Sequence, residues 1–233
     1  MIEGNYFNEY CTYRYNRVRD FLKGFVNTDS SLIEIGCGTG NILAFLRREA
    51  DLKNIAGIDI SEKALLKAYE KGIIETYKGS ILDFEFVSTI NKKYDFVILG
   101  AILHHLVGRT TRESKYNTIH AIENSLNITK DGGYLIIVEP IFEPQIIGVI
   151  IFYVKKFVSI FTKKRVSIFG YWNNLGYPVV YYFTQKNLIN IFQEIKALKL
   201  FNVWEDITLP TLFMRVLRVK KRADLTLIFK KTS

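Results

Sequence analysis

The sequence predicts a single α/β domain in which a mainly parallel sheet is covered on both faces by helices. Over residues 31–140, short apolar runs typical of strands alternate with segments whose apolar residues recur every three or four positions. The predicted strands 31–35 and 93–100 are apolar almost throughout, as in a sheet buried on both sides. Two further strand candidates near the C-terminus complete the sheet.

Composition agrees with one globular domain. The chain has 233 residues, of which 48% are hydrophobic and 24% charged, enough for one well-filled core. It holds two cysteines, too few for a disulfide framework and suited to a reducing compartment. The N-terminus lacks the basic-then-apolar layout of a signal peptide, so a cytoplasmic location is predicted.

Each predicted element is bounded by recognisable residues. Ser61 and Thr184 are suitable N-caps, Gly72 stops a helix, and Pro140 is expected to close the fifth strand. Because the chain ends on a strand pair, an antiparallel edge on the sheet is expected, with an antiparallel final strand. The predicted strands are 31–35, 54–60, 73–79, 93–100, 134–140, 200–207 and 225–231, and the predicted helices are 41–49, 61–72, 111–129 and 184–198.

The strand–helix rhythm divides the single domain, 1–233, into four segments. An N-terminal helical cap covers 1–30, a cofactor-binding core 31–140, an apolar insert 141–183, and a C-terminal helix with a strand pair 184–233. The net charge of +9 is uneven, since 1–140 carries −1, 141–183 carries +4 and 184–233 carries +6. A one-sided basic surface favours an anionic partner, although frequent lysine alone would give the same numbers.

A glycine-rich turn follows the first predicted strand. Gly36, Gly38 and Gly40 occupy the strand-to-helix turn where doubly wound sheets bind ligands, and glycine there allows positive φ and close backbone approach. Asp59 ends the second strand about 20 residues later, the separation at which an acid binds a ribose hydroxyl pair. The turn therefore predicts a nucleoside-containing cofactor.

The spacing separates two cofactor classes. A dinucleotide site has the pattern G-x-G-x-x-G, whereas Asn41 stands where its last glycine would be. Glu34, two residues before the turn, would repel a pyrophosphate and suits a cofactor that carries positive charge. A nicotinamide-dependent oxidoreductase is the alternative.

Five motifs in order then resemble the class I S-adenosylmethionine-dependent methyltransferases, in the branch that acts on small molecules and quinone-like lipids. The resemblance covers about residues 31–140 and 183–230, and implies a doubly wound, Rossmann-like, seven-stranded sheet with S-adenosylmethionine as cofactor. The motifs are Glu34-Ile-Gly-Cys-Gly-Thr-Gly40, Gly57-Ile-Asp59-Ile-Ser61, Tyr94 to Leu106, Asp131 to Pro140, and Phe183-Thr-Gln-Lys-Asn-Leu188.

Carried over by position, the resemblance implies roles for individual residues. Glu34 would orient the methionine half of the cofactor, Asp59 would accept the ribose hydroxyls, and Ile60 would pack on the adenine. Where the family usually has an adenine-binding acid, this chain has Ser80, and Asp83 is a possible substitute. The predicted cofactor-binding residues are Glu34, Gly36, Cys37, Gly38, Gly40, Asp59, Ile60, Ser80, Ile81, Leu99 and Gly100; no metal site is predicted.

Structural alternatives exist for the two acids of the site. Glu34 could cap the amides of its own loop, and Asp59 could cap the helix after Ser61. Non-catalytic use as an S-adenosylmethionine-binding interaction module is a further alternative.

Candidate catalytic residues follow the fourth and fifth strands. A hydroxyl acceptor must lose its proton, usually to His, Glu or Asp. His105 is the first candidate base, with His104 and Glu139 as further candidates, and the alternative is that both histidines only pack or hydrogen-bond.

The acceptor is predicted to be a small or lipid-like molecule. The loop GAILHHL contains no proline, unlike the loop of nucleobase amino-methyltransferases, which argues against a nucleic-acid substrate. In 145–165, apolar and aromatic residues are flanked by lysines, so this stretch is either a lid or a peripheral contact with an anionic membrane. Its apolar run is too short to span a bilayer. Tyrosines 6, 10, 13 and 15 either fold over the cofactor or simply pack.

Overall fold

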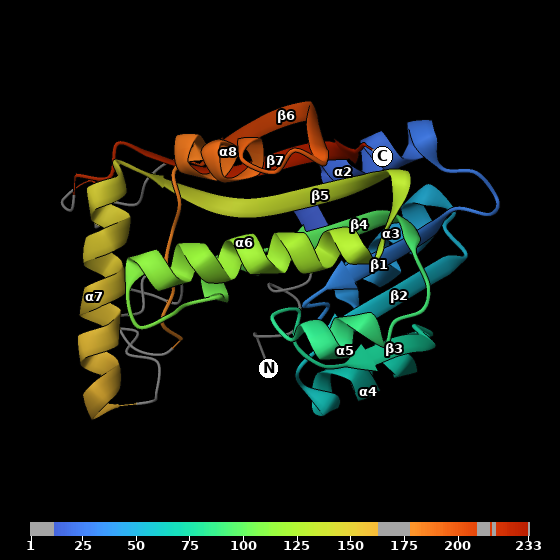
Figure 1. Ribbon diagram of the computed structural model, residues 1–233, viewed down its shortest axis with the longest axis horizontal. Coiled ribbons are helices and arrows are strands. Elements are labelled where there is room, and N and C mark those ends of the chain that lie inside the picture. The colour runs from blue at the N-terminus through green and yellow to red at the C-terminus, as the bar shows by residue number, and fades with distance from the viewer. Residues whose placement is uncertain (1–11, 163–177, 209–214, 216–217, 233) are drawn as a thin grey trace.

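The chain forms a seven-stranded sheet with helices on both faces (Figure 1). The structure is a computed structural model, and it describes residues 12–162, 178–208, 215 and 218–232. The strand order is β3-β2-β1-β4-β5-β7-β6. The strands are β1 Ser31–Ile35, β2 Asn54–Asp59, β3 Glu75–Lys78, β4 Tyr94–Gly100, β5 Thr129–Glu143, β6 Leu198–Thr208 and β7 Lys221–Lys231.

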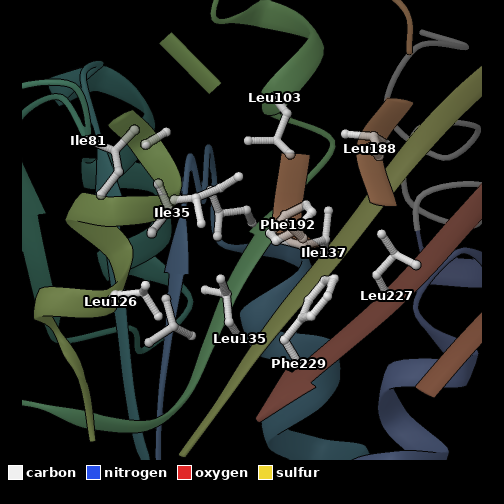
Figure 2. Close-up of a cluster of buried hydrophobic side chains, with 14 of the residues drawn as sticks. Ile35, Ile81, Leu103, Leu126, Leu135, Ile137, Leu188, Phe192, Leu227 and Phe229 are labelled. Carbon is white, nitrogen blue, oxygen red and sulfur yellow. The ribbon is translucent and has the colours of Figure 1, made fainter. Parts of the chain in front are cut away.

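Helices form a layer on each face of the sheet. Helices α2, α3 and α4 pack their buried residues against one face, and α5, α6, α7 and α8 pack against the other. Figure 2 shows the second core, where side chains from β1, β5 and β7 meet those from α6 and α8. The helices are α2 Asn16–Phe25, α3 Asn41–Ala50, α4 Glu62–Glu70, α5 Phe84–Ser88, α6 Thr111–Asn127, α7 Gln145–Phe161 and α8 Gln185–Gln193, with a 3₁₀ turn at Leu103–His105.

The predicted doubly wound sheet is confirmed, with β1 to β5 parallel and β7 antiparallel to both of its neighbours. The expected antiparallel edge is confirmed too, because the last two strands pair antiparallel there, with β7 between β5 and the edge strand β6. The central position of β7 agrees with its burial, since Ala223 to Phe229 are all buried whereas β6 has no fully buried residue.

Pro140 does not close the fifth strand as predicted. Strand β5 continues to Glu143, and Pro140 pairs with Asp224 of β7. On the other side, the pairing of β4 with β5 ends at Gly100 and Val138. Pro140 therefore lies where β5 has a neighbour on one side only, and there its missing N–H breaks no ladder.

The insert 141–183 contains more regular structure than its sequence indicated. After the end of β5 it forms α7, which stands at one end of the molecule (Figure 1). Residues 178–183 then return to the sheet, where Phe183 bridges Ile141. None of the helices in the described part of the chain has the length and hydropathy that a membrane crossing requires.

Candidate functional site

The turn between β1 and α3 is held open by three glycines with left-handed backbone. Gly36, Gly38 and Gly40 have φ of 72°, 53° and 70°. The amides of Gly36 and Cys37 donate to the carbonyl of Ile58, at 2.8 and 3.0 Å, which fixes the turn to the end of β2. Open space surrounds Gly38, because a Cβ built there would meet no atom within 4 Å. The turn thus presents bare backbone at the carboxyl ends of the strands.

Asp59 at the end of β2 holds two backbone amides. Its Oδ2 accepts from the amide of Gly38 at 2.8 Å, and its Oδ1 accepts from the amide of Ser61 at 2.8 Å. Both bonds support the structural alternative that this acid ties the loop and the start of α4 together. A carboxylate has about four acceptor positions, so Asp59 keeps capacity for further donors.

Glu34 is a buried carboxyl without a complete set of partners. It is 2% exposed, and within the described residues its Oε2 has no hydrogen-bond partner. Burial, and then the neighbouring Asp59 carboxylate, raise the pKa of Glu34 well above its ordinary range. The same surroundings raise the pKa of the adjacent Cys37 thiol, again mainly through burial. A buried acceptor left open in this way is costly and suits a donor that arrives with a ligand.

The N-terminal helix adds a tyrosine to the same place. Tyr15, 3% exposed, lies over Gly100 at the end of β4. A Cβ built on Gly100 would stand 1.9 Å from the Tyr15 hydroxyl oxygen and 3.2 Å from Glu34 Oε1. Both polar atoms therefore converge over a residue that must be glycine.

A salt bridge anchors the segment that carries Tyr15. Arg14 Nε lies 3.1 Å from Asp224 Oδ1, and both side chains are almost buried. Burial raises the pKa of Asp224, and the charges of Arg14 and Arg222 oppose that shift. The bridge joins the start of the N-terminal helix to the middle of β7, so the sheet itself positions Tyr15.

Substitution of Gly100 by Ala is expected to damage this site. The added methyl group would overlap the Tyr15 hydroxyl, so we expect a loss of about 1–3 kcal/mol in the free energy of unfolding. Tyr15→Phe in the same chain removes the nearest clashing atom and should recover part of that loss. Gly24→Ala, where a Cβ meets nothing within 4 Å, is the matched control and should not destabilise. Urea unfolding checks all three; equal stability of Gly100→Ala and wild type would contradict the close approach.

The predicted adenine end of the site is more open. Ile60 is 75% exposed, while Ile81 is buried and its carbonyl accepts from Asn124. Ser80 Oγ accepts from the amide of Leu82 at 3.2 Å. Asp83, the possible substitute for the family's acid, caps α5 through the amide of Phe86. Adenine contacts by these residues stay predictions.

The candidate catalytic residues are brought together in an unexpected pair. His104 Nδ1 lies 2.6 Å from Glu139 Oε2, and Glu139 Oε1 accepts from the amide of Leu103 at 2.6 Å. Both side chains are buried, whereas His105, the first candidate, is exposed. The His104 ring also lies 5.6 Å from the ring of Tyr182 and nearly parallel to it. Geometry therefore favours His104 over His105 as an oriented base.

Some of these features had no signal in the sequence. Among the four tyrosines singled out, Tyr15 is buried at the site, Tyr13 is 61% exposed, and residues 6 and 10 lie outside the described residues. The bridge between Arg14 and Asp224 joins residues far apart in the chain, and no spacing rule connects them. By contrast, Leu99 and Gly100 end β4 beside the glycine turn, as expected from the parallel order.

The arrangement fits S-adenosylmethionine by its own chemistry. An open acceptor on Glu34 suits a cationic amino group, bare backbone at Gly38 allows close approach, and Asp59 retains acceptor capacity for ribose hydroxyls. Nearby carboxyl groups would disfavour a pyrophosphate. The residues present therefore fit a positively charged nucleoside better than a dinucleotide.

Comparison with known proteins gives relatives of the same kind. Residues 33–135 match a family model described as a methyltransferase domain. The chain is 26% identical over 121 residues to the Ribosomal RNA small subunit methyltransferase C of Colwellia psychrerythraea, covering 49% of this chain and 33% of that protein. It is 27% identical over 197 residues to the protein 235L of Invertebrate iridescent virus 6, covering 82% of this chain and 66% of that protein. The chain thus spans less than two thirds of the length of either relative.

A solved structure shares the fold over the whole chain. The N-methyltransferase NodS from Bradyrhizobium japonicum WM9, in complex with S-adenosyl-L-homocysteine, superposes with a TM-score of 0.59 at 15% identity, covering 100% of this chain and 90% of that one. At this identity the likeness shows the fold. The chain therefore shares this fold, and within it residues 33–135 match a methyltransferase domain.

Proposed function

We propose that this protein transfers the methyl group of S-adenosylmethionine to a small or lipid-like acceptor. The observation that carries the proposal is the open, buried oxygen of Glu34 beside the glycine turn. A carboxyl group buried without a partner destabilises the empty protein, and a bound ammonium group would offset that cost. The match of residues 33–135 to a methyltransferase domain supports the reaction class, and the open oxygen of Glu34 supports the binding mode of the cofactor.

The cofactor-binding roles in this proposal follow the predicted set. Glu34 receives the amino group, the backbone at Gly36, Cys37, Gly38 and Gly40 surrounds the amino-acid half, and Asp59 accepts from the ribose. Ile60, Ser80 and Ile81 border the adenine, and Leu99 and Gly100 border the sulfur. Tyr15 joins this set because its hydroxyl lies over Gly100.

When bound, the cofactor supplies an electrophilic methyl group on a cationic sulfur. The chain's own residues then position the acceptor and remove its proton. In the proposed step His104 Nε2 takes a proton from an acceptor hydroxyl, while Glu139 accepts the hydrogen bond of Nδ1–H and orients the ring. Glu139 is a positioning residue, because the Leu103 amide and His104 use both of its oxygens.

The surroundings of His104 support an apolar or aromatic acceptor. Tyr182 packs on its ring and on Phe142, with ring centroids 4.3 Å apart in the latter pair. Phe152 of α7 contacts Tyr181 nearby. Pockets lined by aromatic side chains with few polar groups suit apolar ligands. Nucleic acid is not favoured as the acceptor, and residues 141–183 are proposed as the lid and substrate segment of the single domain.

We also propose a peripheral contact with an anionic membrane through residues 145–165, which would bring the enzyme to a lipid-like acceptor. Lid and membrane contact are compatible uses of one segment.

Ligand-induced thermal stabilisation tests the cofactor class. S-adenosylhomocysteine at about 100 times its dissociation constant should stabilise the protein by about 2.7 kcal/mol, whereas NAD should give no shift. Differential scanning fluorimetry with each nucleoside at several concentrations measures this. Stabilisation by NAD alone would overturn the proposal in favour of an oxidoreductase.

Label transfer tests the reaction itself. The protein is incubated with a methyl-labelled donor and a fractionated extract, and label is counted in lipid, small-molecule and nucleic-acid pools. We expect label in the lipid or small-molecule pool, abolished by Asp59→Ala. Label in nucleic acid alone would contradict the acceptor class, and cofactor binding without label in any pool would favour a non-catalytic interaction module.

A further inference from the structure

We infer that the outward face of α7 is a docking surface for an anionic lipid bilayer, on which the helix lies in the plane of the membrane. The inference sharpens the membrane contact proposed above, and it rests on the surface of α7 and not on the methyl-transfer chemistry. The membrane contact and the proposed methyl transfer can therefore be disproved independently.

The outward face is a continuous stripe of large apolar side chains. Its members recur at intervals of three and four residues, which places them on one side of the helix. Phe157, Ile160 and Phe161 are 62%, 74% and 75% exposed, and none of the seven side chains is charged. The apolar stripe of α7 consists of Ile146, Ile150, Tyr153, Val154, Phe157, Ile160 and Phe161.

The opposite side of the same helix is fixed to the domain. Gly148, Phe152 and Lys155 are its buried residues, and a Cβ on Gly148 would stand 2.7 Å from the carbonyl of Tyr182. Lys156 donates from Nζ to the carbonyl of Arg109, at the start of α6. The helix, which stands at one end of the molecule (Figure 1), is therefore anchored along one side, and its apolar stripe is exposed. Packing among the described residues does not account for that stripe.

Within the described residues, cations lie at the N-terminal end of the stripe, and the sequence that follows α7 is basic. At its N-terminal end, exposed Lys186 and Lys220 lie with Pro144, the N-cap of α7, around one depression. At its C-terminal end the sequence continues with Lys163, Lys164 and Arg165. Lys155 and Lys156 do not take this role, because Lys155 is 4% exposed and Lys156 bonds to Arg109.

The basic charge near the apolar stripe favours an anionic bilayer as the binding partner. An apolar helix face with a basic rim matches the acyl chains and anionic headgroups of a membrane surface. A second copy of the chain would bring a basic surface against a basic surface, which is unfavourable. Helix α7 lies on such a surface and does not cross it, since 17 residues extend only about 25 Å.

Vesicle co-sedimentation tests the stripe with a matched control. The full-length protein should sediment with vesicles of phosphatidylcholine and phosphatidylglycerol. Phe157→Ser/Ile160→Ser should reduce the partition coefficient by about a hundredfold, because two large side chains no longer enter the interface. The control Phe84→Ser/Ile74→Ser removes equivalent side chains, 62% and 77% exposed, outside α7 and should bind like wild type.

A second pair of variants tests the rim. Lys186→Glu/Lys220→Glu should weaken binding about tenfold or more, whereas Lys63→Glu/Lys67→Glu, the same charge change on exposed lysines of α4, should weaken it much less. The inference is overturned if the wild-type protein stays in the supernatant. It is also overturned if the control variants lose as much vesicle binding as the variants of the stripe and the rim. Light scattering that shows a wild-type dimer converted to monomer by Phe157→Ser/Ile160→Ser would assign the stripe to a second copy instead.

Discussion

Glu34→Gln is expected to make the ligand-free protein more stable and its cofactor binding weaker. Glutamine keeps the size of the side chain and removes the buried charge. We expect a gain of about 1–2 kcal/mol in the free energy of unfolding near pH 8, because an unpaired buried carboxylate no longer has to be desolvated. For a chain of this size the unfolding midpoint should rise by about 3 °C or more.

The cost of this substitution should appear in binding. A hydrogen bond between a buried carboxylate and an ammonium group contributes about 1.5–3 kcal/mol, so affinity for S-adenosylhomocysteine should fall by about 10- to 100-fold. Isothermal titration calorimetry measures the dissociation constant of S-adenosylhomocysteine for each protein. Asp131→Asn, which changes an exposed carboxylate far from the site, is the control and should leave affinity unchanged. A destabilised Glu34→Gln protein with full affinity would show that Glu34 only supports the loop.

The stability difference should depend on pH in a definite direction. The pKa of Glu34 is raised in the folded protein, above the value of about 4.3 expected when unfolded. Below that pH the carboxyl is protonated in both states and makes no difference. As pH rises above it, the unfolded chain ionises first, so wild-type stability falls until the folded pKa is passed. The advantage of Glu34→Gln in unfolding midpoint should therefore be larger at pH 8 than at pH 5.

His104→Ala should reduce the rate of methyl transfer by about 10²- to 10³-fold while leaving cofactor affinity intact. A positioned general base contributes about that factor, and His104 is a buried imidazole that the Glu139 carboxyl group orients. Added imidazole should restore part of the rate, which a purely structural role would not predict.

Glu139→Gln tests the positioning role separately. Both donors that face Glu139 need an acceptor, and an amide offers one oxygen in place of two. We expect the turnover number to fall about tenfold or more, with KM for the donor little changed. The control is His120→Ala on the exposed side of α6, which should retain the wild-type rate. A normal rate in both His104→Ala and Glu139→Gln would remove the dyad from the mechanism and leave transfer to positioning alone.

Much of this molecule was predictable because the informative residues are local in sequence. The alternation of strands and helices predicted the parallel sheet, and the glycine turn predicted left-handed backbone at Gly36, Gly38 and Gly40. These signals survive without tertiary context, since they depend on periodicity and on the φ that glycine allows.

Where prediction failed, a neighbour distant in sequence decided the outcome. Pro140 stays within β5 because the pairing with β4 ends at Val138. Beyond that point no β4 carbonyl needs the N–H that proline lacks. The place of β7 between β5 and β6 was not predicted, because order in the chain does not reveal order in the sheet.

The sequence by itself predicted the fold class. It also singled out the glycine-rich turn and the two acids, Glu34 and Asp59, that are proposed to bind the cofactor. Only the tertiary structure decided that the Tyr15 hydroxyl and Glu34 Oε1 both lie over Gly100. It also decided that His104 lies against Glu139, and that α7 carries an exposed apolar stripe. The physical reason is that burial and hydrogen bonding of a side chain depend on residues tens of positions away. No local pattern records which of two adjacent histidines, or which face of an apolar helix, will be covered.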